Sequence, residues 1–511
     1  MLGKKDRSQR SLFIPGSIED FIPEDHILKR VDKVLDLSWL REEVEDSYCE
    51  DNGRPGIDPE SAVRLMLAGF FHGIVHDRKL MREAQVNLAI RWFSGYGLGE
   101  DLPDHSSLTR IRQRWGVERF KRIFLKTVES CVAAGLVSCE TVHTDATLIR
   151  ADVSWESLTT EYADTSFESN KEDNVESPCQ AKRGKKRSTT DPDATMTTSN
   201  KEYRMEPCYK QHSAVDDKAG VVVGVETTTG EVNEGAKLLE MIKSVESATG
   251  NKVNCVTGDA GYAHPHNYRA LEERGTNAVI PPQNMGRARK GMHISRFKYD
   301  SHNDVVCCPA GKKLCRASPA RNGWVYRAKR RDCRRCRFQS ECVPPSAELR
   351  TIVIVDGYPS LLRARRRHTR WDDEHTIYNR HRFRVEGLHG EAKTQHGLRR
   401  AVRRGLANVA IQVYLTAAII NLKRLAGRFS LLLLYVFRAI RRRITRLSPI
   451  KVDFINCYGL TPQHACGSQK PEKNRVFQHP HCHSVDCPHF FGRSLKTEYL
   501  GSVISDASGS S

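Results

Sequence analysis

Residues 378–405 read YNRHRFRVEGLHGEAKTQHGLRRAVRRG, and the fold and the functional site are predicted from this stretch outward. It leads into the apolar segment NVAIQVYLTAAIINLKRL with no proline in between, and this pattern predicts a helix. At about 100° per residue, Arg382, Glu386 and Lys393 share one face of that helix. Glu391 lies about 140° around the helix from Glu386 and cannot share the face. The face is either a solvated surface with i,i+4 ion pairs or a carboxylate site between two cations.

Two aspartates far upstream favour the carboxylate site. Asp145 lies in the β-branched segment ETVHTDATLI, and Asp259 follows the apolar segment KVNCVTG, so each is expected at or near the end of a strand. Such a sheet edge leaves room for ligands, although aspartates there are also common turn residues. Three carboxylates that include Glu386 would repel one another unless divalent cations neutralised them. Hard oxygen ligands select Mg²⁺ or Mn²⁺, and two such ions support phosphodiester chemistry.

These segments resemble a DDE transposase of bacterial insertion sequences, in the group marked by a Tyr–Arg–Glu–Lys signature. Arg382, Glu386 and Lys393 reproduce the spacing Arg-x3-Glu-x6-Lys. Tyr378 stands one position further out than the tyrosine of the signature. HTDATLIRAD and TGDAGYAHPHNYRALEERG resemble the two aspartate segments, LPDHSSLTRIR the helical N-terminal module, and YRAKRRDCRRCRFQSEC the cysteine-bearing insert. The resemblance covers about residues 12–427.

The resemblance implies an α/β fold with a ribonuclease-H-like catalytic core, a mixed sheet with helices. The core follows an all-helical DNA-binding domain and is interrupted by the insert. Asp145, Asp259 and Glu386 would be the catalytic residues and bind two Mg²⁺ (or Mn²⁺) ions. The enzyme would cut double-stranded DNA at the ends of an insertion sequence and join the 3′ ends to target DNA, as a homodimer. Arg382 and Lys393 would contact DNA phosphates near the cut.

The charge of the chain agrees with a nucleic-acid partner. Lys and Arg number 81 against 62 Asp and Glu, a net charge of +19. The surplus is concentrated in KRGKKR (182–187), RARRRHTR (363–370), RRAVRR (399–404) and RAIRRRITR (438–446). Phosphate contacts release counterions, so such clusters suit DNA better than the alternative of a solvated basic surface. The third cluster supplies the candidate DNA-binding residues Arg399, Arg400, Arg403 and Arg404.

The sequence predicts a cytoplasmic, nucleoid-associated protein without membrane contact. The first residues, MLGKKDRSQRSLFIPG, lack the apolar region of a signal peptide. The most apolar run, FSLLLLYVF (429–437), is shorter than the roughly 20 residues of a membrane span.

The chain divides into five expected segments. They are a helical N-terminal DNA-binding domain (1–139), the first part of the catalytic core (140–284), a basic, loop-rich insert (285–350), the second part of the core (351–448), and an irregular, disordered tail (449–511). In the first segment, Asp58 is expected to cap a helix that begins at Pro59. In the second, strands are expected to form a hairpin near Gly220, and a flexible polar excursion is expected at 154–205.

The insert contains the candidate metal ligands Cys308, Cys333, Cys336 and Cys342. Cys333 and Cys336 have CxxC spacing, and Cys308 begins a Cys-Pro-x-Gly turn. Four thiolates of this kind hold structural zinc, and the alternative is free cysteines in a surface insert. Cysteines and histidines in the tail fit no zinc module.

Two other functions remain open at this level. One is a plain metal-dependent nuclease that uses the same core without strand transfer. The other is a non-enzymatic DNA-binding protein derived from an inactive transposase, against which the intact spacing of the acids argues.

Overall fold

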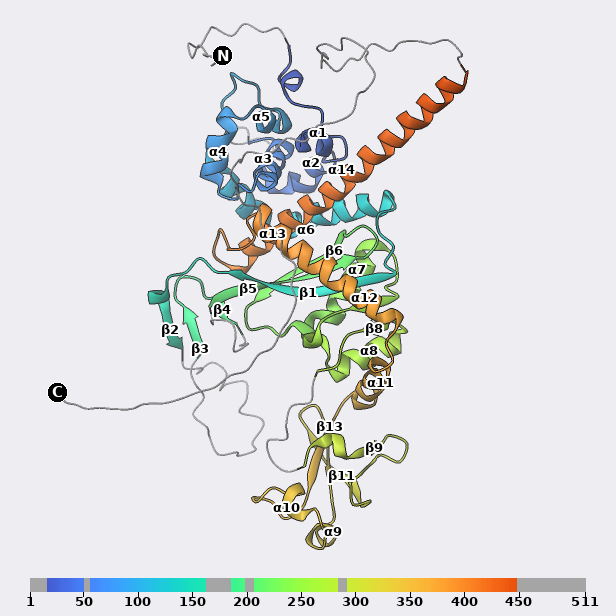
Figure 1. The fold of residues 1–511 in the computed structure, drawn as a ribbon. Coiled ribbons are helices and arrows are strands. Elements are labelled where there is room, and N and C mark those ends of the chain that lie inside the picture. Colours follow the sequence, from blue (N-terminus) through green and yellow to red (C-terminus); the bar gives the residue numbers. More distant parts are fainter. Residues whose placement is uncertain (1–15, 50–55, 162–184, 198–205, 284–291, 448–511) are drawn as a thin grey trace, which may run out of the picture. The chain divides into compact units, whose positions relative to one another are not determined.

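The computed structural model describes residues 16–49, 56–161, 185–197, 206–283 and 292–447 (Figure 1). The tail predicted at 449–511 and much of the polar excursion lie outside these residues. Residues Met1–Ile444 belong to one contact unit, so the predicted domain boundaries within it remain predictions.

The N-terminal part is helical, as predicted. Its α-helices are α1 (Ile27–Asp32), α2 (Leu40–Val44), α3 (Pro59–Phe71), α4 (Asp77–Val86), α5 (Leu88–Ser94) and α6 (His105–Ala133). The carboxylate of Asp58 accepts a hydrogen bond from the Ser61 amide at 2.9 Å, which confirms the predicted cap of α3. α6 is broken at Gly116, where φ is 68°, because glycine adopts this left-handed conformation without a steric penalty.

A mixed sheet forms the centre of the chain. β1 (Thr141–Arg150), β5 (Pro207–Asp216) and β6 (Val222–Thr229) are antiparallel neighbours, and the β5–β6 hairpin turns at Gly220 as predicted. β7 (Cys255–Thr257) lies parallel to β1, and β8 (Asn277–Val279) lies parallel to β7. The mixed α/β core of the prediction is therefore present.

Helices cover both faces of this sheet. Ser213 on β5 bonds to His389 of α13 (Gly387–Gln395) at 3.1 Å, whereas the next residue, Ala214, packs beside Gly224 under α7 (Leu238–Thr249). Because successive side chains on a strand point to opposite faces, α13 and α7 lie on opposite sides. α12 (Asp373–His381) contacts β7 and β8, and α8 (Pro265–Arg274) connects these two strands (Figure 1).

The helix predicted from Tyr378 onward is interrupted twice, which corrects the expectation of one continuous helix. α12 passes into a π-helical turn, η7 (Arg382–Glu386), before α13. After α13 the chain reverses at Gly397, where φ is 68°, and Arg400 bridges to Arg150 of β1. The apolar segment then forms a separate helix, α14 (Leu406–Leu447). Glycine in the left-handed region ends the first helix, a conformation that the apolar pattern could not reveal.

α14 is anchored between the sheet and the N-terminal helices. The buried side chain of Asn421 accepts a hydrogen bond from the Val222 amide and donates one to the Val222 carbonyl, at 2.8 and 2.9 Å. It also donates to Thr127 of α6 at 3.2 Å. Residues Leu406–Phe429 are long and apolar enough for a membrane span, but 78% of the apolar window is buried inside the protein. A buried core helix of a soluble protein meets the same criterion, so this is weak evidence for a span.

The excursion predicted as flexible contains strands in its described part. β2 (Leu158–Glu161), β3 (Lys185–Ser188) and β4 (Thr195–Met196) extend the central sheet beyond β5. Tyr209 of β5 donates a hydrogen bond to the buried Asp191 at 2.6 Å and helps to fix this extension. The polar composition concealed these strands because a tertiary partner, not their own apolar pattern, stabilises them.

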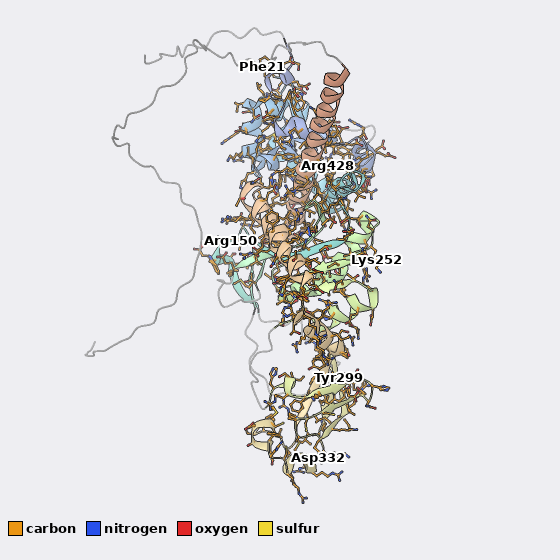
Figure 2. All side chains as sticks on the ribbon, turned by 45° about the vertical axis from the view of Figure 1, so that its right-hand side comes forward. Phe21, Arg150, Lys252, Tyr299, Asp332 and Arg428 are labelled. Atoms are coloured by element: carbon orange, nitrogen blue, oxygen red, sulfur yellow. The ribbon has the colours of Figure 1, made fainter. Side chains whose placement is uncertain are left out.

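The insert is a folded module, not the loop-rich segment that was predicted. Its strands form an antiparallel sheet in the order β13 (Thr351–Val355), β12 (Gly323–Arg327), β11 (Lys313–Ala320), β10 (Val305–Cys307) and β9 (Lys298–Asp300). α9 (Arg330–Arg334) and α10 (Gln339–Cys342) follow β12, and Tyr299 and Asp332 are labelled in this module in Figure 2. The boundary predicted at 350 would separate β13 from the sheet that it completes. α11 (Tyr358–His368) then leads to α12.

Candidate active site

The register of two parallel strands brings the predicted aspartates together. Val142 pairs with Val256 and His143 with Thr257, so continuing the register places Asp145 level with Asp259. Asp259 follows β7 directly and caps the short helix η5 (Ala260–Tyr262) by accepting the Gly261 amide at 2.8 Å. Asp145 accepts the amide of Ala146 at 2.8 Å.

A third carboxylate, which the sequence analysis missed, joins this pair. Glu234 begins η4 (Glu234–Lys237), the short helix after β6. One oxygen each from Asp145, Glu234 and Asp259 lie within 4.8 Å of one another. In sequence, Glu234 looks like an acidic residue in the first turn of a helix, where the helix dipole explains it. The signal in the sequence was its position after the predicted hairpin, whose first strand, β5, pairs Ser213 with Asp145.

Burial and mutual repulsion perturb this acid centre. Burial raises the pKa of Asp145 to about 7; the Ala146 hydrogen bond opposes the shift, and the charges of Asp259, Glu234 and Glu386 add to it. Burial also raises the pKa of Glu234; the charge of the nearby Lys210 lowers this pKa, and the charge of Asp259 raises it further. Carboxylates held together in this way are stabilised by protons or by bound cations. Three oxygen donors from separate elements fit a divalent cation such as Mg²⁺ or Mn²⁺.

Glu386 lies beside the acid centre and outside the group of close oxygens. It is 59% exposed, and its carboxylate accepts a hydrogen bond from Arg382 at 2.9 Å, as the i,i+4 spacing predicted. Its charge is nevertheless close enough to raise the pKa values of Asp145 and Tyr378. A hollow of about 800 Å³ is lined by Glu386, Arg382 and Arg424.

α13 provides two further groups near Asp145. His389, another residue that the sequence analysis missed, has Nδ1 3.6 Å from an Asp145 oxygen and Nε2 3.1 Å from Ser213. Burial lowers the pKa of His389 to about 3, which favours the neutral imidazole beside Asp145. Lys393 is half-buried; burial lowers its pKa, Arg399 lowers it further, and Asp145 opposes the shift. Lys393 therefore lies on the Asp145 side of α13.

Glu391 has a different environment, as the helix geometry predicted. It is 13% exposed and forms ion pairs with Lys423 and Arg424 of α14. These contacts connect α13 to α14 and leave Glu391 outside the acid centre.

The four predicted DNA-binding arginines after α13 differ in their surroundings. Arg399 is exposed, Arg400 pairs with Asp152 at 2.6 Å, and Arg404 donates to the Asp152 carbonyl at 3.1 Å. Arg403 is only 20% exposed and pairs with the buried Asp77 of α4 at 2.5 Å. In the N-terminal part, Arg112 is also buried against Asp77.

The predicted cysteine ligands gather in the insert. Cys333 and Cys342 are buried, and Cys308 and Cys336 are partly buried. Burial raises the pKa of the Cys342 thiol; Arg350 opposes this, and the charges of Cys333, Cys336 and Cys308 add to it. The four sulfurs therefore share one neighbourhood, although within the described residues only the acids meet the 4.8 Å spacing of a closed metal group.

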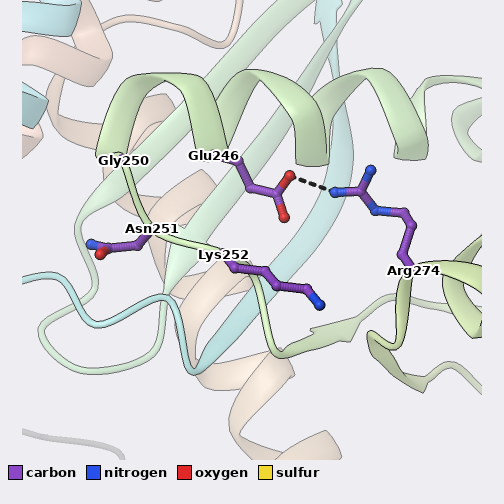
Figure 3. A pocket seen from close by; sticks show the side chains of 5 residues that line it. All are labelled: Glu246, Gly250, Asn251, Lys252 and Arg274. Carbon is purple, nitrogen blue, oxygen red and sulfur yellow. Dashed lines mark hydrogen bonds and ion pairs between the residues drawn. The ribbon is translucent and has the colours of Figure 1, made fainter.

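A separate shallow pocket contains none of the predicted site residues. It is lined by Glu246, Gly250, Asn251, Lys252 and Arg274. Glu246 and Arg274 form an ion pair across it (Figure 3). This ion pair joins the last turns of α7 and α8 and gives the pocket a structural explanation.

Two transposase domain families match this chain. The family described as transposase domain (DUF772) matches residues 16–114, and the transposase DDE domain matches residues 307–426. The second range contains Glu386 and all four candidate cysteines, whereas Asp145, Glu234 and Asp259 precede it.

Three solved structures match this chain at low sequence identity and low TM-score. The synaptic complex of piggyBac transposase with hairpin DNA is 10% identical, with 84% of this chain and 86% of that chain covered and a TM-score of 0.30. The Mos1 transposase paired-end complex with left transposon end is 12% identical, covering 47% of this chain and 65% of that chain, with a TM-score of 0.15. The Mos1 mariner paired-end complex with Mn is 13% identical, covering 47% and 64%, with a TM-score of 0.14. A search of curated proteins found no match.

Proposed function

We propose a mechanism for this chain, which is a DDE transposase and therefore an enzyme that acts on DNA. It cuts double-stranded DNA at the ends of an insertion sequence and joins the 3′ ends to target DNA. Asp145, Asp259 and Glu386 are the catalytic carboxylates, and Mg²⁺ or Mn²⁺ is the metal. The protein works as a homodimer on DNA in the cytoplasm, and it belongs to the group with the Tyr–Arg–Glu–Lys signature.

The observation that carries this proposal is the register between β1 and β7. Two aspartates separated by more than a hundred residues of sequence lie level with each other, Asp145 on β1 and Asp259 directly after β7, with a third acid close to both. Glu386, at the end of the η7 turn that contacts β1 and β5, is close enough for its charge to raise the pKa of Asp145. An enzyme core has little structural reason to concentrate acids in this way, since their repulsion destabilises the fold.

The residues of the chain have distinct parts in the reaction. Divalent cations bound at the acids would lower the pKa of the attacking water or 3′-hydroxyl and stabilise the leaving oxygen. His389 is held by its contact with Ser213 at 3.1 Å and would help to position Asp145, whose carboxylate oxygen lies 3.6 Å from its Nδ1. Arg382 orients the exposed Glu386 until DNA arrives, because its guanidinium already contacts that carboxylate.

DNA phosphates would bind beside this centre. Arg382 is 80% exposed, and Arg399 is exposed as well, so both can meet a phosphate backbone without breaking a buried contact. Lys393 is close enough to Arg399 and Asp145 for both charges to affect its pKa, and it would approach the phosphate next to the cut. Arg400 and Arg404 could exchange their contacts with Asp152 for phosphates. Arg403 has a structural explanation in its contact with Asp77.

The insert would hold one structural zinc ion through Cys308, Cys333, Cys336 and Cys342. In support, the amide of Lys312 donates to the Cys308 sulfur at 3.3 Å, and the amide of Phe338 donates to the Cys336 sulfur at 3.5 Å. Amide donors of this kind stabilise thiolate charge. Zinc would draw the four sulfurs closer together, at about 2.3 Å from the metal.

The proposal is tested with Asp259→Asn. The amide removes one charge from the acid centre and none from the basic surface, so Mg²⁺-dependent nicking of element-end DNA should be abolished while binding in a gel-shift stays within a few fold. Asp145→Asn and Glu386→Gln should behave in the same way. Asp101→Asn, at an exposed position of the N-terminal part, is the matched control. Nicking by Asp259→Asn at the wild-type rate would remove Asp259 from the site. Joining of 3′ ends to a target plasmid distinguishes a transposase from a nuclease.

A further inference from the structure

We propose that Glu234 is a further metal-binding carboxylate of the catalytic centre, holding a divalent cation together with Asp145 and Asp259. The inference rests on the proposed function, because the transposase DDE domain implies a divalent metal. It adds a ligand that the acid pattern of the sequence does not contain. Among the described residues, the acids with one oxygen each within 4.8 Å of the others are Asp145, Glu234 and Asp259, and Glu386 is not among them.

Two glycines allow Glu234 to approach Asp259. A Cβ atom on Gly261 would lie 2.9 Å from an Asp259 oxygen and 3.4 Å from a Glu234 oxygen. A Cβ atom on Gly235 would collide with the His264 ring at 2.2 Å and with the Gly261 carbonyl at 2.9 Å. At Gly235 the η4 turn therefore packs against the backbone of η5, an approach that a Cβ atom there would block, and at Gly261 the two carboxylates occupy the space of a Cβ atom.

Hydrogen bonds fix the turn that carries Glu234. Asn233 accepts hydrogen bonds from the Gly235 amide and from His264 Nε2, both at 3.0 Å. The buried Asn267 of α8 donates to the Gly235 carbonyl at 2.8 Å and to the Tyr262 carbonyl at 3.0 Å. The backbone on both sides of Glu234 is thus tied to the segment that carries Asp259. A carboxylate positioned this firmly is prepared for a ligand with fixed geometry.

The charge of Glu234 is incompletely balanced within the protein. In the described part of the chain, the cation beside it is Lys210, whose Nζ lies 3.6 Å away and makes its shorter hydrogen bond to the Val232 carbonyl at 2.8 Å. Glu234 is 29% exposed and faces two other carboxylates. Partial burial beside like charges is unfavourable, and a divalent cation would compensate it directly. The alternative is that Glu234 serves only as the partner of Lys210.

Binding of Mn²⁺ to the full-length protein without DNA separates these two roles. The free Mn²⁺ signal in electron paramagnetic resonance gives the affinity, a readout that does not depend on catalysis. Glu234→Gln should weaken Mn²⁺ binding about tenfold or more, since one of three charged ligands is lost. Glu240→Gln is the matched control, because Glu240 belongs to the adjoining α7, is 64% exposed and pairs with Lys237. Binding by Glu234→Gln within about twofold of wild type would overturn the inference.

Lys210→Met keeps the inference testable if Glu234→Gln fails to fold. Removing the competing cation should tighten Mn²⁺ binding when Glu234 is a ligand. Unchanged affinity in Lys210→Met would show that Glu234 does not reach the metal. Asp145→Asn and Asp259→Asn show whether the whole catalytic centre or only the role of Glu234 is wrong. If both variants bind Mn²⁺ like wild type, the proposed catalytic centre fails as a whole. If both lose Mn²⁺ and Glu234→Gln does not, only the assignment of Glu234 fails.

Discussion

Replacing Asp77 by asparagine tests how far the protein depends on one buried carboxylate. Asp77 is 7% exposed, and its two oxygens accept hydrogen bonds from Arg112, which is 3% exposed, both at 2.8 Å. Arg403, from the segment after α13, donates another at 2.5 Å. Asparagine preserves the shape of the side chain but leaves two guanidinium groups without their counter-charge. The contact between α4, α6 and the segment after α13 would then be unfavourable.

The magnitude follows from the burial of these groups. Removing one partner of a buried ion pair costs about 3–5 kcal/mol. A second guanidinium increases the loss, but Arg403 is 20% exposed and water screens part of its charge. We expect Asp77→Asn to lower the free energy of unfolding by about 4 kcal/mol. Urea denaturation followed by circular dichroism measures this quantity. Asp46→Asn is the control, because Asp46 pairs with Arg119 at 2.5 Å but is 71% exposed, and its loss should not be measurable.

The same pair predicts a pH dependence. Burial raises the pKa of Asp77, but the hydrogen bonds and charges of Arg112 and Arg403 outweigh burial and leave the pKa below its usual value. A carboxyl group with a lowered pKa in the folded state stabilises the fold above its unfolded pKa, about 3.9, and this contribution is lost as the pH falls through the folded pKa. The difference between wild type and Asp77→Asn should therefore be complete at neutral pH and shrink below about pH 4. Equal stability at neutral pH, or a difference that persists in acid, would refute the reasoning.

Three further predictions concern other parts of the molecule. Glu391→Gln should lower the free energy of unfolding by about 2 kcal/mol, because Lys423 and Arg424 lose their buried partner. DNA nicking per folded molecule should stay unchanged, and a variant that folds normally but does not nick DNA would contradict this. Arg382→Ala and Lys393→Ala should each lower the slope of log affinity against log salt for end DNA by about 0.9, whereas Arg403→Gln should reduce stability and leave the slope unchanged. Unchanged salt slopes in Arg382→Ala and Lys393→Ala would show that neither residue contacts DNA phosphates, and Arg382 would then serve only as the ion-pair partner of Glu386. Metal analysis of protein purified without chelators should find one equivalent of zinc, and replacing Cys333 and Cys336 by serine should remove it. Less than about a tenth of an equivalent in the wild-type protein would count against the zinc site.

Local patterns were sufficient for those parts of the site that lie on regular elements. Asp259 followed an apolar run and lies directly after β7, as predicted. Asp145 was also expected at or near the end of a strand, but it lies in the middle of β1, which continues beyond the end of β7 along β5. Glu386 and Arg382 were predicted to pair from their i,i+4 spacing, and they do. Glu234 and His389 were not predictable, because each looks ordinary in its own helix and acquires a role only through contact with a strand distant in sequence. Arg403 was assigned to DNA by its charged neighbours, which say nothing about Asp77.

The fold of the insert was likewise not predictable from local sequence patterns. Its strands are short, charged and interrupted by Pro319 and by a shift of register between Arg316 and Ser318. One face of the sheet buries residues such as Leu314, Tyr326 and Ile352, while the other stays exposed. That alternation was too brief and irregular to outweigh the basic loops around it, so the sheet was missed although its cysteines were recognised.

The π-helical turn changes the position of Tyr378 around the helix relative to Glu386. Tyr378 precedes Glu386 by eight positions, which in an uninterrupted α-helix would put the two side chains about 80° apart. A π-turn accommodates one extra residue, and η7 lies between them; with that residue absorbed, the separation falls to about 20°. The environment of Tyr378 agrees, because burial raises its pKa and the charges of Asp259, Asp145 and Glu386 raise it further. An insertion of one residue would normally rotate everything before it away from the acids. Here the turn confines that rotation to five residues and keeps Tyr378 close enough to Asp259, Asp145 and Glu386 for their charges to raise its pKa.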